Sequence, residues 1–346
     1  MPFEAPTIHL DALALPSGTW LCGEDGGAAP LMAALGLAGP VGAAQDAPLS
    51  IGHEGLRIDA WPVAPPPDPR ALPEPLHGLL WEGEGETLHL TDAARLPGFD
   101  GPDALPDLRV QCLFDPPAAE TLAASAPYLA ALEPGHWFAA HLLDDRGAPW
   151  SHWPRGCGIF LRTHAPFEGI RANLRRFTKL PDGDGWVFLR LAEPRTLLPL
   201  LLGLSPGLRG RLFGGVAAMV AIDPDEGIVL RATCTDLPAA EPIRVTPALR
   251  ATLAAGALAR FAGEAERFCR ETLIDRPAPP EARAFCRAAI EAARAAGLHD
   301  RQAVLLAVAA AWAAGEAGWI AAQRDIIDDR TVAQIGRGRA LLRRAH

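Results

Sequence analysis

The sequence changes character near residue 237. Before this point, short apolar segments alternate with Gly, Pro and Asp, which is typical of strands joined by turns. After it, longer segments place apolar residues at helical spacing. Chains that segregate strands and helices in this way form α+β folds. We therefore expect a mixed α/β lobe, with a small sheet flanked by helices, followed by a C-terminal all-helical lobe.

Prolines suggest a further division of the N-terminal part. Residues 62–75 contain Pro65, Pro66 and Pro67. Proline fixes φ and lacks a main-chain donor, so this stretch is expected to be an extended linker. The 346-residue chain is also long for a single core. We predict a variable N-terminal segment over 1–75 that ends in this linker, an α/β domain over 76–237 and a helical lobe over 238–346.

Apolar patterning predicts the elements within these regions. Strands are expected at 56–61, 78–81, 108–114, 137–143, 158–161 and 186–191, and a hairpin at 216–222 and 227–233. The strand at 186–191 follows a turn and is expected to be buried. Helices are expected at 167–177 and 196–204.

The helical lobe has a clear start signal. Thr246 offers a capping hydroxyl, and Pro247 suits the first helical position. This helix is expected to reach about residue 272. Others are expected at 281–296, 301–314 and 325–342, and the segment 301–314 is apolar almost all round, which predicts a buried helix.

Charge and hydropathy restrict the partners. The net charge is −9, and no basic stretch is long enough to replace phosphate counterions, so we expect no nucleic-acid partner. The most apolar run, 302–314, is shorter than a bilayer span, so we expect no membrane partner. The first residues show no signal-peptide pattern, and the six cysteines are scattered. These features together predict a cytoplasmic protein.

Local clusters give little support for an enzyme. His136, His141, His152 and His164 lie in one region, but no pair has the i,i+4 spacing of zinc-binding helices. Cys157 lies between glycines and directly before an apolar strand, where a buried structural thiol is more frequent than a nucleophile. We therefore expect no catalytic residue, no cofactor and no metal. A hydrolase or transferase that uses His152 or Cys157 is the enzymatic alternative.

The middle of the chain contains a set of short motifs in a defined order. Ala-Pro-Tyr-Leu at 126–129 is followed by Trp153 and the apolar strand at 158–161. The segment 173–177 reads Asn-Leu-Arg-Arg-Phe, and 190–195 reads Arg-Leu-Ala-Glu-Pro-Arg. The residues that define the set are Pro127, Tyr128, Trp153, Gly158, Leu174, Arg175, Arg190, Glu193, Pro194 and Arg195.

In order and spacing, these motifs resemble the adaptor, or effector-chaperone, family of bacterial type VI secretion systems. The resemblance covers about 78–237 and is strongest over 126–215. It implies a protein that binds a secreted effector and loads it onto a VgrG-type spike protein, without chemistry of its own. It also implies that the helical lobe helps to select the cargo. An interaction protein of an unrelated pathway is the other alternative.

One position departs from the family pattern. The family has Asp before the proline, whereas this chain has Glu193, whose longer side chain is less suited to a tight cap. Arg190 and Arg195 are each able to bind a carboxylate in a bidentate manner. We favour internal partners for them, for example Glu193 or Asp182, over a direct contact with another protein.

Overall fold

A computed structural model describes residues 7–9, 49–63, 75–96, 99, 105–143, 156, 158–223 and 227–345 of the chain. The described residues divide into two compact units. The first contains the sheet and ends at Leu253, and the second begins at Ala254. Strands on both sides of the proline-rich stretch belong to the first unit, and the division falls beyond residue 237. The α+β prediction, with a helical C-terminal region, is confirmed.

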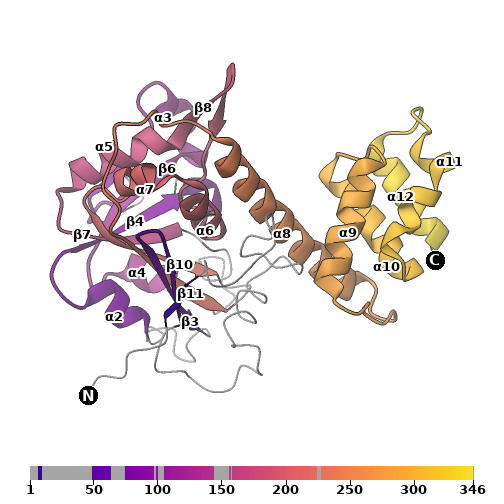
Figure 1. Cartoon of the computed structure of the whole chain (residues 1–346), viewed down its shortest axis with the longest axis horizontal. Coiled ribbons are helices and arrows are strands. Elements are labelled where there is room, and N and C mark those ends of the chain that lie inside the picture. Colours follow the sequence, from indigo (N-terminus) through magenta and orange to yellow (C-terminus); the bar gives the residue numbers. More distant parts are fainter. Residues whose placement is uncertain are drawn as a thin grey trace. The chain divides into compact units, whose positions relative to one another are not determined.

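The first unit is built on a nine-stranded sheet (Figure 1). Its spatial order is β1-β2-β3-β11-β10-β7-β4-β6-β5. Neighbouring strands are antiparallel except for β1 and β2. The strands are β1 (Thr7–His9), β2 (Leu49–His53), β3 (Leu56–Pro62), β4 (Glu86–Asp92), β5 (Val110–Cys112), β6 (Pro127–Leu132), β7 (Gly158–Thr163), β10 (Val216–Asp223) and β11 (Ile228–Cys234).

Strand β4 lies between β6 and β7, yet it is rich in polar residues. Thr87, His89 and Thr91 are all buried there. A buried polar group is tolerated when it is hydrogen-bonded. Thr87 donates to the carbonyl of Leu80, and Arg162 of β7 donates to the Thr87 hydroxyl over 2.8 Å. This strand was not predicted from the sequence, because its polar residues obscure the apolar pattern.

Helices cover the sheet (Figure 1). On one face, α2 and α4 bury Leu80 and Phe138 in a core shared with Tyr128, Phe160 and Val229 of the strands. The other helices of this unit follow β4, β5, β7 and β9. The unit contains α2 (Leu76–Trp81), η2 (Ala93–Arg95), α3 (Ala118–Thr121), η4 (Ala123–Ser125), α4 (Trp137–Leu142), α5 (Phe167–Thr178), α6 (Pro194–Gly203) and α7 (Pro206–Leu212).

Two predicted strands are helices. Residues 78–81 belong to α2, and residues 137–142 belong to α4. Both are short apolar runs, for which periodicity does not separate a strand from a buried helix. His136 begins α4, where its Nδ1 accepts a hydrogen bond from the main-chain N–H of Phe138 over 3.2 Å. The predicted helix at 167–177 and the hairpin at 216–233 are confirmed.

A separate two-stranded sheet lies between α5 and α6. It is the hairpin of β8 (Lys179–Asp182) and β9 (Gly185–Phe188), which projects from the unit beside the β8 label of Figure 1. The turn between them is the one expected before the strand at 186–191. The expected buried strand at 186–191 is wrong in its burial, because Trp186 and Phe188 are each 59% exposed.

The second unit is helical. The long α8 (Pro247–Thr272) begins as expected, with the Thr246 hydroxyl accepting from the N–H of Leu249 over 3.1 Å, and contributes its residues from Ala254 onward. α9 (Ala282–Ala295) and α10 (Arg301–Ala314) follow, and α10 is buried as predicted. The segment expected as one helix over 325–342 is instead divided between two helices. The remaining elements are η6 (Ala317–Ala322), α11 (Arg324–Ile327) and α12 (Gln334–Ala345).

Close packing of α10 and α12 holds this unit together. Gly338 of α12 lies so near α10 that a Cβ atom there would be 2.8 Å from the carbonyl oxygen of Ala303. Arg337 beside it is buried and donates to the carbonyl of Ile327 over 2.5 Å. Among the described helices of both units, none has the length and apolar character that crossing a membrane requires.

Candidate docking surface

Most of the residues that carry the motif resemblance are placed in the first unit. Pro127 and Tyr128 begin β6, Gly158 begins β7, and Leu174 and Arg175 lie in α5. The segment from Arg190 to Arg195 joins β9 to α6. Trp153 lies outside the described residues, as do His152 and Cys157 of the enzymatic alternative.

The β8–β9 hairpin carries the most exposed aromatic side chains of this region. Trp186 and Phe188 are two residues apart on one strand, so they project from the same face. The ammonium group of Lys179, on β8, lies 4.6 Å from the ring centroid of Trp186 and 5.6 Å from that of Phe188. Lys179 is the single lysine of the chain. The face therefore combines two apolar rings with one cation.

A pocket of about 220 Å³ lies at the end of β9. Phe188 joins it to the aromatic face of the hairpin, and Leu122, which is itself exposed, contributes to its wall. The motif residues Pro127 and Arg190 also line it. The remaining lining residues are Asp92, Phe114, Ser125, Thr178, Leu189, Leu191 and Ala192. We call the pocket together with Lys179, Trp186 and Phe188 the hairpin surface.

Ion pairs fix the chain between β9 and α6 beside this pocket. Arg190 lies 3.2 Å from Asp92, and Arg195 lies 3.3 Å from Asp223. Both arginines therefore have internal partners, but not those suggested from the sequence. Glu193 pairs with Arg95 instead, and Asp182 pairs with Arg250.

Glu193 occupies the position before α6 without capping the helix through its side chain. Its longer arm reaches Arg95 in η2, while the Thr196 hydroxyl donates to the Glu193 carbonyl over 2.7 Å. Pro194 then takes the first helical position, where its missing N–H has no cost. With Glu193 in place of the family's Asp, the carboxylate pairs with Arg95, and α6 still begins at Pro194.

Other motif residues support the surface from behind. The buried Tyr128 donates its hydroxyl to the carbonyl of Ala123 over 3.2 Å, next to the pocket residues Leu122 and Ser125. Leu174 is buried in α5, and Arg175 pairs with Asp115, three residues after β5. These contacts hold β6, α5 and the pocket wall in one arrangement.

Gly158 permits a close approach of β7 to β4. A Cβ atom at this position would be 2.3 Å from the carbonyl oxygen of Leu90 and 2.5 Å from Nε2 of His89. Both distances are too short for non-bonded heavy atoms, so any larger residue would displace a central strand. Gly158 therefore has a structural role in the sheet.

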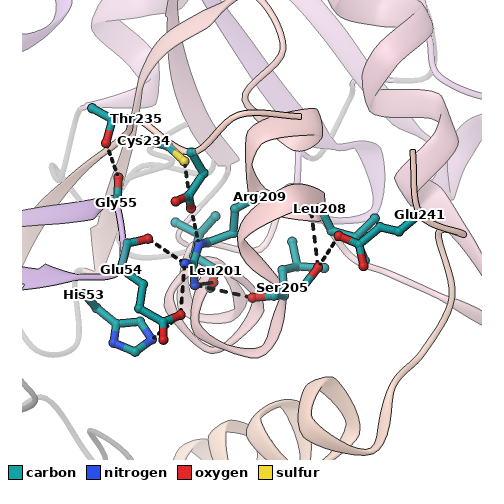
Figure 2. Close-up of polar contacts among 12 residues, drawn as sticks. His53, Glu54, Gly55, Leu201, Ser205, Leu208, Arg209, Cys234, Thr235 and Glu241 are labelled. Carbon is teal, nitrogen blue, oxygen red and sulfur yellow. Dashed lines mark hydrogen bonds and ion pairs between the residues drawn. The ribbon is translucent and has the colours of Figure 1, made fainter. Parts of the chain in front are cut away.

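A second polar cluster surrounds Arg209 of α7 (Figure 2). This side chain is only 1% exposed. Its Nε donates to Oδ2 of Asp236 over 2.8 Å, and its Nη2 donates to the carbonyl of Glu54 over 2.8 Å. Its Nη1 donates to the carbonyl of Leu204 over 3.3 Å. The guanidinium thereby joins the α6–α7 corner, the β2–β3 turn and the chain after β11.

The neighbours of Arg209 extend the same network. Ser205 caps α7 by accepting from the N–H of Leu208 over 3.3 Å and donates to Oε1 of Glu241 over 2.6 Å (Figure 2). The Cys234 thiol donates to Oδ2 of Asp236 over 3.4 Å. Because the guanidinium is buried and its donors are engaged, the cluster is a structural junction rather than a ligand site.

Arg209 was not predicted from the sequence, although its helix contains a pattern that indicates its role. Gly207 and Gly210 flank it in α7. A Cβ atom at Gly210 would be 2.6 Å from the carbonyl oxygen of Asp236. Glycines three residues apart on a helix indicate that another main chain passes close by, and a buried arginine between them is suited to hold that chain.

The remaining candidates form no metal site in the part of the chain that is described. There, no three His, Cys, Asp or Glu side chains gather in a suitable cluster. His136 caps α4, and Nδ1 of His141 lies 2.7 Å from the carbonyl oxygen of Trp137. Burial raises the pKa of the Cys112 and Cys234 thiols, to about 11 for Cys234, which disfavours the reactive thiolate.

Comparison with known proteins identifies one domain. Residues 99–211 match the family described as "Domain of unknown function (DUF4123)". The match covers less than half of the chain and contains the motif residues from Pro127 to Arg195 as well as Arg209. No curated protein and no solved structure matches the chain.

Proposed function

We propose that this protein is a cytoplasmic adaptor that binds a type VI secretion effector and promotes its loading onto a VgrG-type spike protein. The observation that supports the proposal is the position of the motif residues in the folded protein. Motif residues distant in sequence, such as Pro127 and Arg190, line one pocket beside the exposed aromatic rings of the hairpin. A shared exposed apolar surface is what a protein-binding domain requires.

The chemistry of the hairpin surface suits a protein partner. Burying a large apolar side chain against a partner contributes about 1.5–3 kcal/mol, so Trp186 and Phe188 are able to anchor a complex. The ion pairs Arg190–Asp92 and Arg195–Asp223 are intramolecular, so these arginines position the surface rather than bind the partner. The proposal therefore needs no catalytic residue, cofactor, metal, nucleic acid or membrane.

In this proposal, the helical unit contributes to the choice of cargo. Helix-in-groove binding uses exposed apolar side chains. Ile274, two residues after α8, is 81% exposed, and Val332, before α12, is exposed as well. The sheet-containing unit then carries the family-specific surface, and the helical unit carries the variable surface that helps to select the cargo.

The test is recovery of both partners from the native host. The tagged full-length chain should co-purify with an effector and a spike protein, and deletion of its gene should stop secretion of that effector. Replacing Trp186 and Phe188 by Ala should lower the recovery, whereas Trp137→Ala should not. Trp137 is a matched control, because it is 50% exposed on α4.

Two results would contradict the proposal. One is recovery of neither partner together with intact secretion in the deletion strain. The other is loss of host function in a variant with His152→Ala and Cys157→Ser that still folds and still binds the effector, because this outcome would support the enzymatic alternative.

A further inference from the structure

Within the described residues, the hairpin has one open edge, which belongs to β9. The Pro181 carbonyl in β8 accepts from the N–H of Val245 over 2.9 Å, so it points away from β9. Pro181 is opposite Trp186 in the register. In an antiparallel pair, the residue opposite an outward-facing one also faces outward. The main-chain N–H and C=O of Trp186 therefore point to the free side of β9.

The main-chain N–H and C=O of Phe188 also point to the free side of β9. The N–H of Leu189 donates to the Thr178 carbonyl over 2.9 Å, so this pair is hydrogen-bonded, and the preceding pair of Lys179 and Phe188 is not. Within the described part of the chain, no hydrogen bond engages the main-chain groups of Trp186 or Phe188. Trp186 and Phe188 of β9 thus have main-chain donors and acceptors that no described residue engages.

Other edges near this surface are covered. The outer edge of β8 meets Val245, as described above. The outer strand β5 lies beside α5, whose Arg171 donates to the Cys112 carbonyl over 2.8 Å and whose Glu168 accepts from Gln111 over 2.7 Å. These contacts leave little room for another strand at β5.

Natural edge strands are usually protected by Lys, Pro or a very short length, because an open edge invites pairing with another chain. β8 contains both Lys179 and Pro181. β9 reads Gly-Trp-Val-Phe and contains no charge and no proline. Of these devices β9 has only its length of four residues, and an exposed apolar edge without Lys or Pro is suited to a specific partner strand.

The pocket adds specificity to this edge. It lies where β9 ends, and Phe188 and Leu189 form part of its wall. A dry cavity of ~150 Å³ is known to accept a benzene molecule. The pocket of about 220 Å³ therefore has room for one aromatic or branched side chain of a strand that runs along β9.

Charge favours an acidic residue in that strand. Lys179 is exposed, and no carboxylate of the described residues lies within ion-pair distance of its ammonium group. Arg176, at the end of α5, is exposed as well. The nearest acidic residue of β8, Asp182, is already held by Arg250. Lys179 and Arg176 are thus exposed cations at the open end of the hairpin, whereas the exposed carboxylate of Asp184 lies in the turn at its other end.

We propose that the open edge of β9 binds an extended segment of the partner protein as an added strand. This segment inserts one large apolar side chain into the pocket and places a carboxylate beside Lys179. The inference deepens the proposed function and rests on it, because the segment belongs to the protein that the adaptor carries or delivers. Trp186 and Phe188 bind it with both their main chains and their rings.

A displayed library of random dodecapeptides is the probe. The full-length chain should enrich peptides with large apolar residues at alternate positions and at least one Asp or Glu. Phe188→Ala or Trp186→Ala should weaken a selected peptide by more than about tenfold, and Trp137→Ala should leave it unchanged. Thermal melts of the variants should match that of the wild type, since all three side chains are exposed.

N-methylation of one selected peptide tests the binding mode. A strand uses the N–H groups of alternate residues, so methylation at one set of alternate positions should abolish binding, and methylation at the other set should be tolerated. Bound peptide should also slow acetylation of Lys179, read by mass spectrometry. The proposal is overturned if no peptide prefers the wild type over the Trp186→Ala and Phe188→Ala double variant, or if the methylation pattern does not alternate.

The adaptor function and strand addition at β9 are distinguished by the results of these two experiments. If the host effector and spike protein co-purify with the chain but the library yields no strand-like peptide, the adaptor function stands and strand addition is wrong. If strand-like peptides are selected but neither host protein is recovered, the β9 edge is a peptide site and the adaptor function is wrong.

Discussion

Arg209 and Asp236 form a charged hydrogen bond of 2.8 Å in which the arginine is almost completely buried. Asp236 lies after β11, and Arg209 lies in α7. The pair therefore fastens a segment that leaves the sheet to a helix that precedes it in sequence. A buried charge that loses its partner lowers the free energy of unfolding, so the contribution of this junction to stability is measurable.

Arg209→Met should lower the free energy of unfolding by about 3–5 kcal/mol, because it leaves the Asp236 carboxylate with little exposure and without its cation. Urea unfolding followed by circular dichroism measures this loss. Arg250→Met is the matched control. Arg250 also pairs with an aspartate, Asp182, but its side chain is exposed, so the loss should stay below about 1 kcal/mol. Equal losses in the two variants would contradict the structural role of Arg209.

Gly158→Ala should destabilise the sheet by about 1–3 kcal/mol, because the added Cβ would overlap the carbonyl of Leu90 and the ring of His89. Gly169→Ala provides the opposite control. Gly169 lies within α5, and a Cβ there meets nothing within 4 Å. Replacing a helical glycine by alanine should then stabilise the protein by about 0.5–1 kcal/mol. A stabilising effect of Gly158→Ala in the same unfolding assay would refute the close approach of β4 and β7.

Arg95→Ala should cost more stability than Glu193→Gln. Glu193 is buried, and within the described residues its Oε1 atom has no hydrogen-bond partner. Removing Arg95 leaves a buried carboxylate with its charge uncompensated, for which we expect a loss of about 2 kcal/mol. Glu193→Gln removes that charge and should cost about half as much. Chemical denaturation of both variants gives the order, and a larger loss in Glu193→Gln would show that the carboxylate is not held by Arg95.

Alkaline pH should weaken the Arg209 junction through Cys234. Burial is the main cause that raises the pKa of this thiol to about 11 in the folded protein, against ~8.5 in an unfolded chain, and the Asp236 carboxylate raises it further, while the main-chain N–H of Asp236 acts in the opposite direction. The unfolded state therefore loses its proton first. The contribution of Cys234 to stability is complete below pH ~8.5 and is lost as the pH rises towards 11.

Cys234→Ala tests this pH dependence. Urea unfolding of the wild type should show a decline in stability between pH ~8.5 and ~10.5 that is larger than in the variant, since all other titrating groups are shared. Identical slopes for the two proteins would exclude a contribution from this thiol.

The fold class and the helical lobe were predictable because their signals are local. The capping hydroxyl of Thr246 and the all-round apolar segment of α10 each lie within a few residues of sequence. The short elements were not predictable in the same way. Residues 78–81 and 137–142 are helical because the core shared with Tyr128 and Phe160 accepts them as helices, which is a tertiary effect.

Only part of the hairpin surface could be predicted from the sequence. The motif residues from Arg190 to Arg195 point to this region, but the exposure of Trp186 and Phe188 does not follow from their apolar character. An isolated two-stranded hairpin buries fewer side chains than a strand in a large sheet. Whether an apolar strand joins the nine-stranded sheet or stands apart from it depends on contacts such as Val245 to Pro181, which are distant in sequence.

The pairing of β3 with β11 has a consequence for biosynthesis. Pro62 of β3 faces Ile228 of β11, and the two are separated by roughly 170 residues of nascent chain. At a translation rate of ~5–20 residues per second, β3 leaves the ribosome roughly 8–35 s before its partner strand. During this interval its buried residues Leu56 and Ile58 have no partner strand on that side. The translation rate therefore sets how long this apolar strand waits for its partner, and we expect synonymous codons between residues 62 and 228 to influence the yield of folded protein.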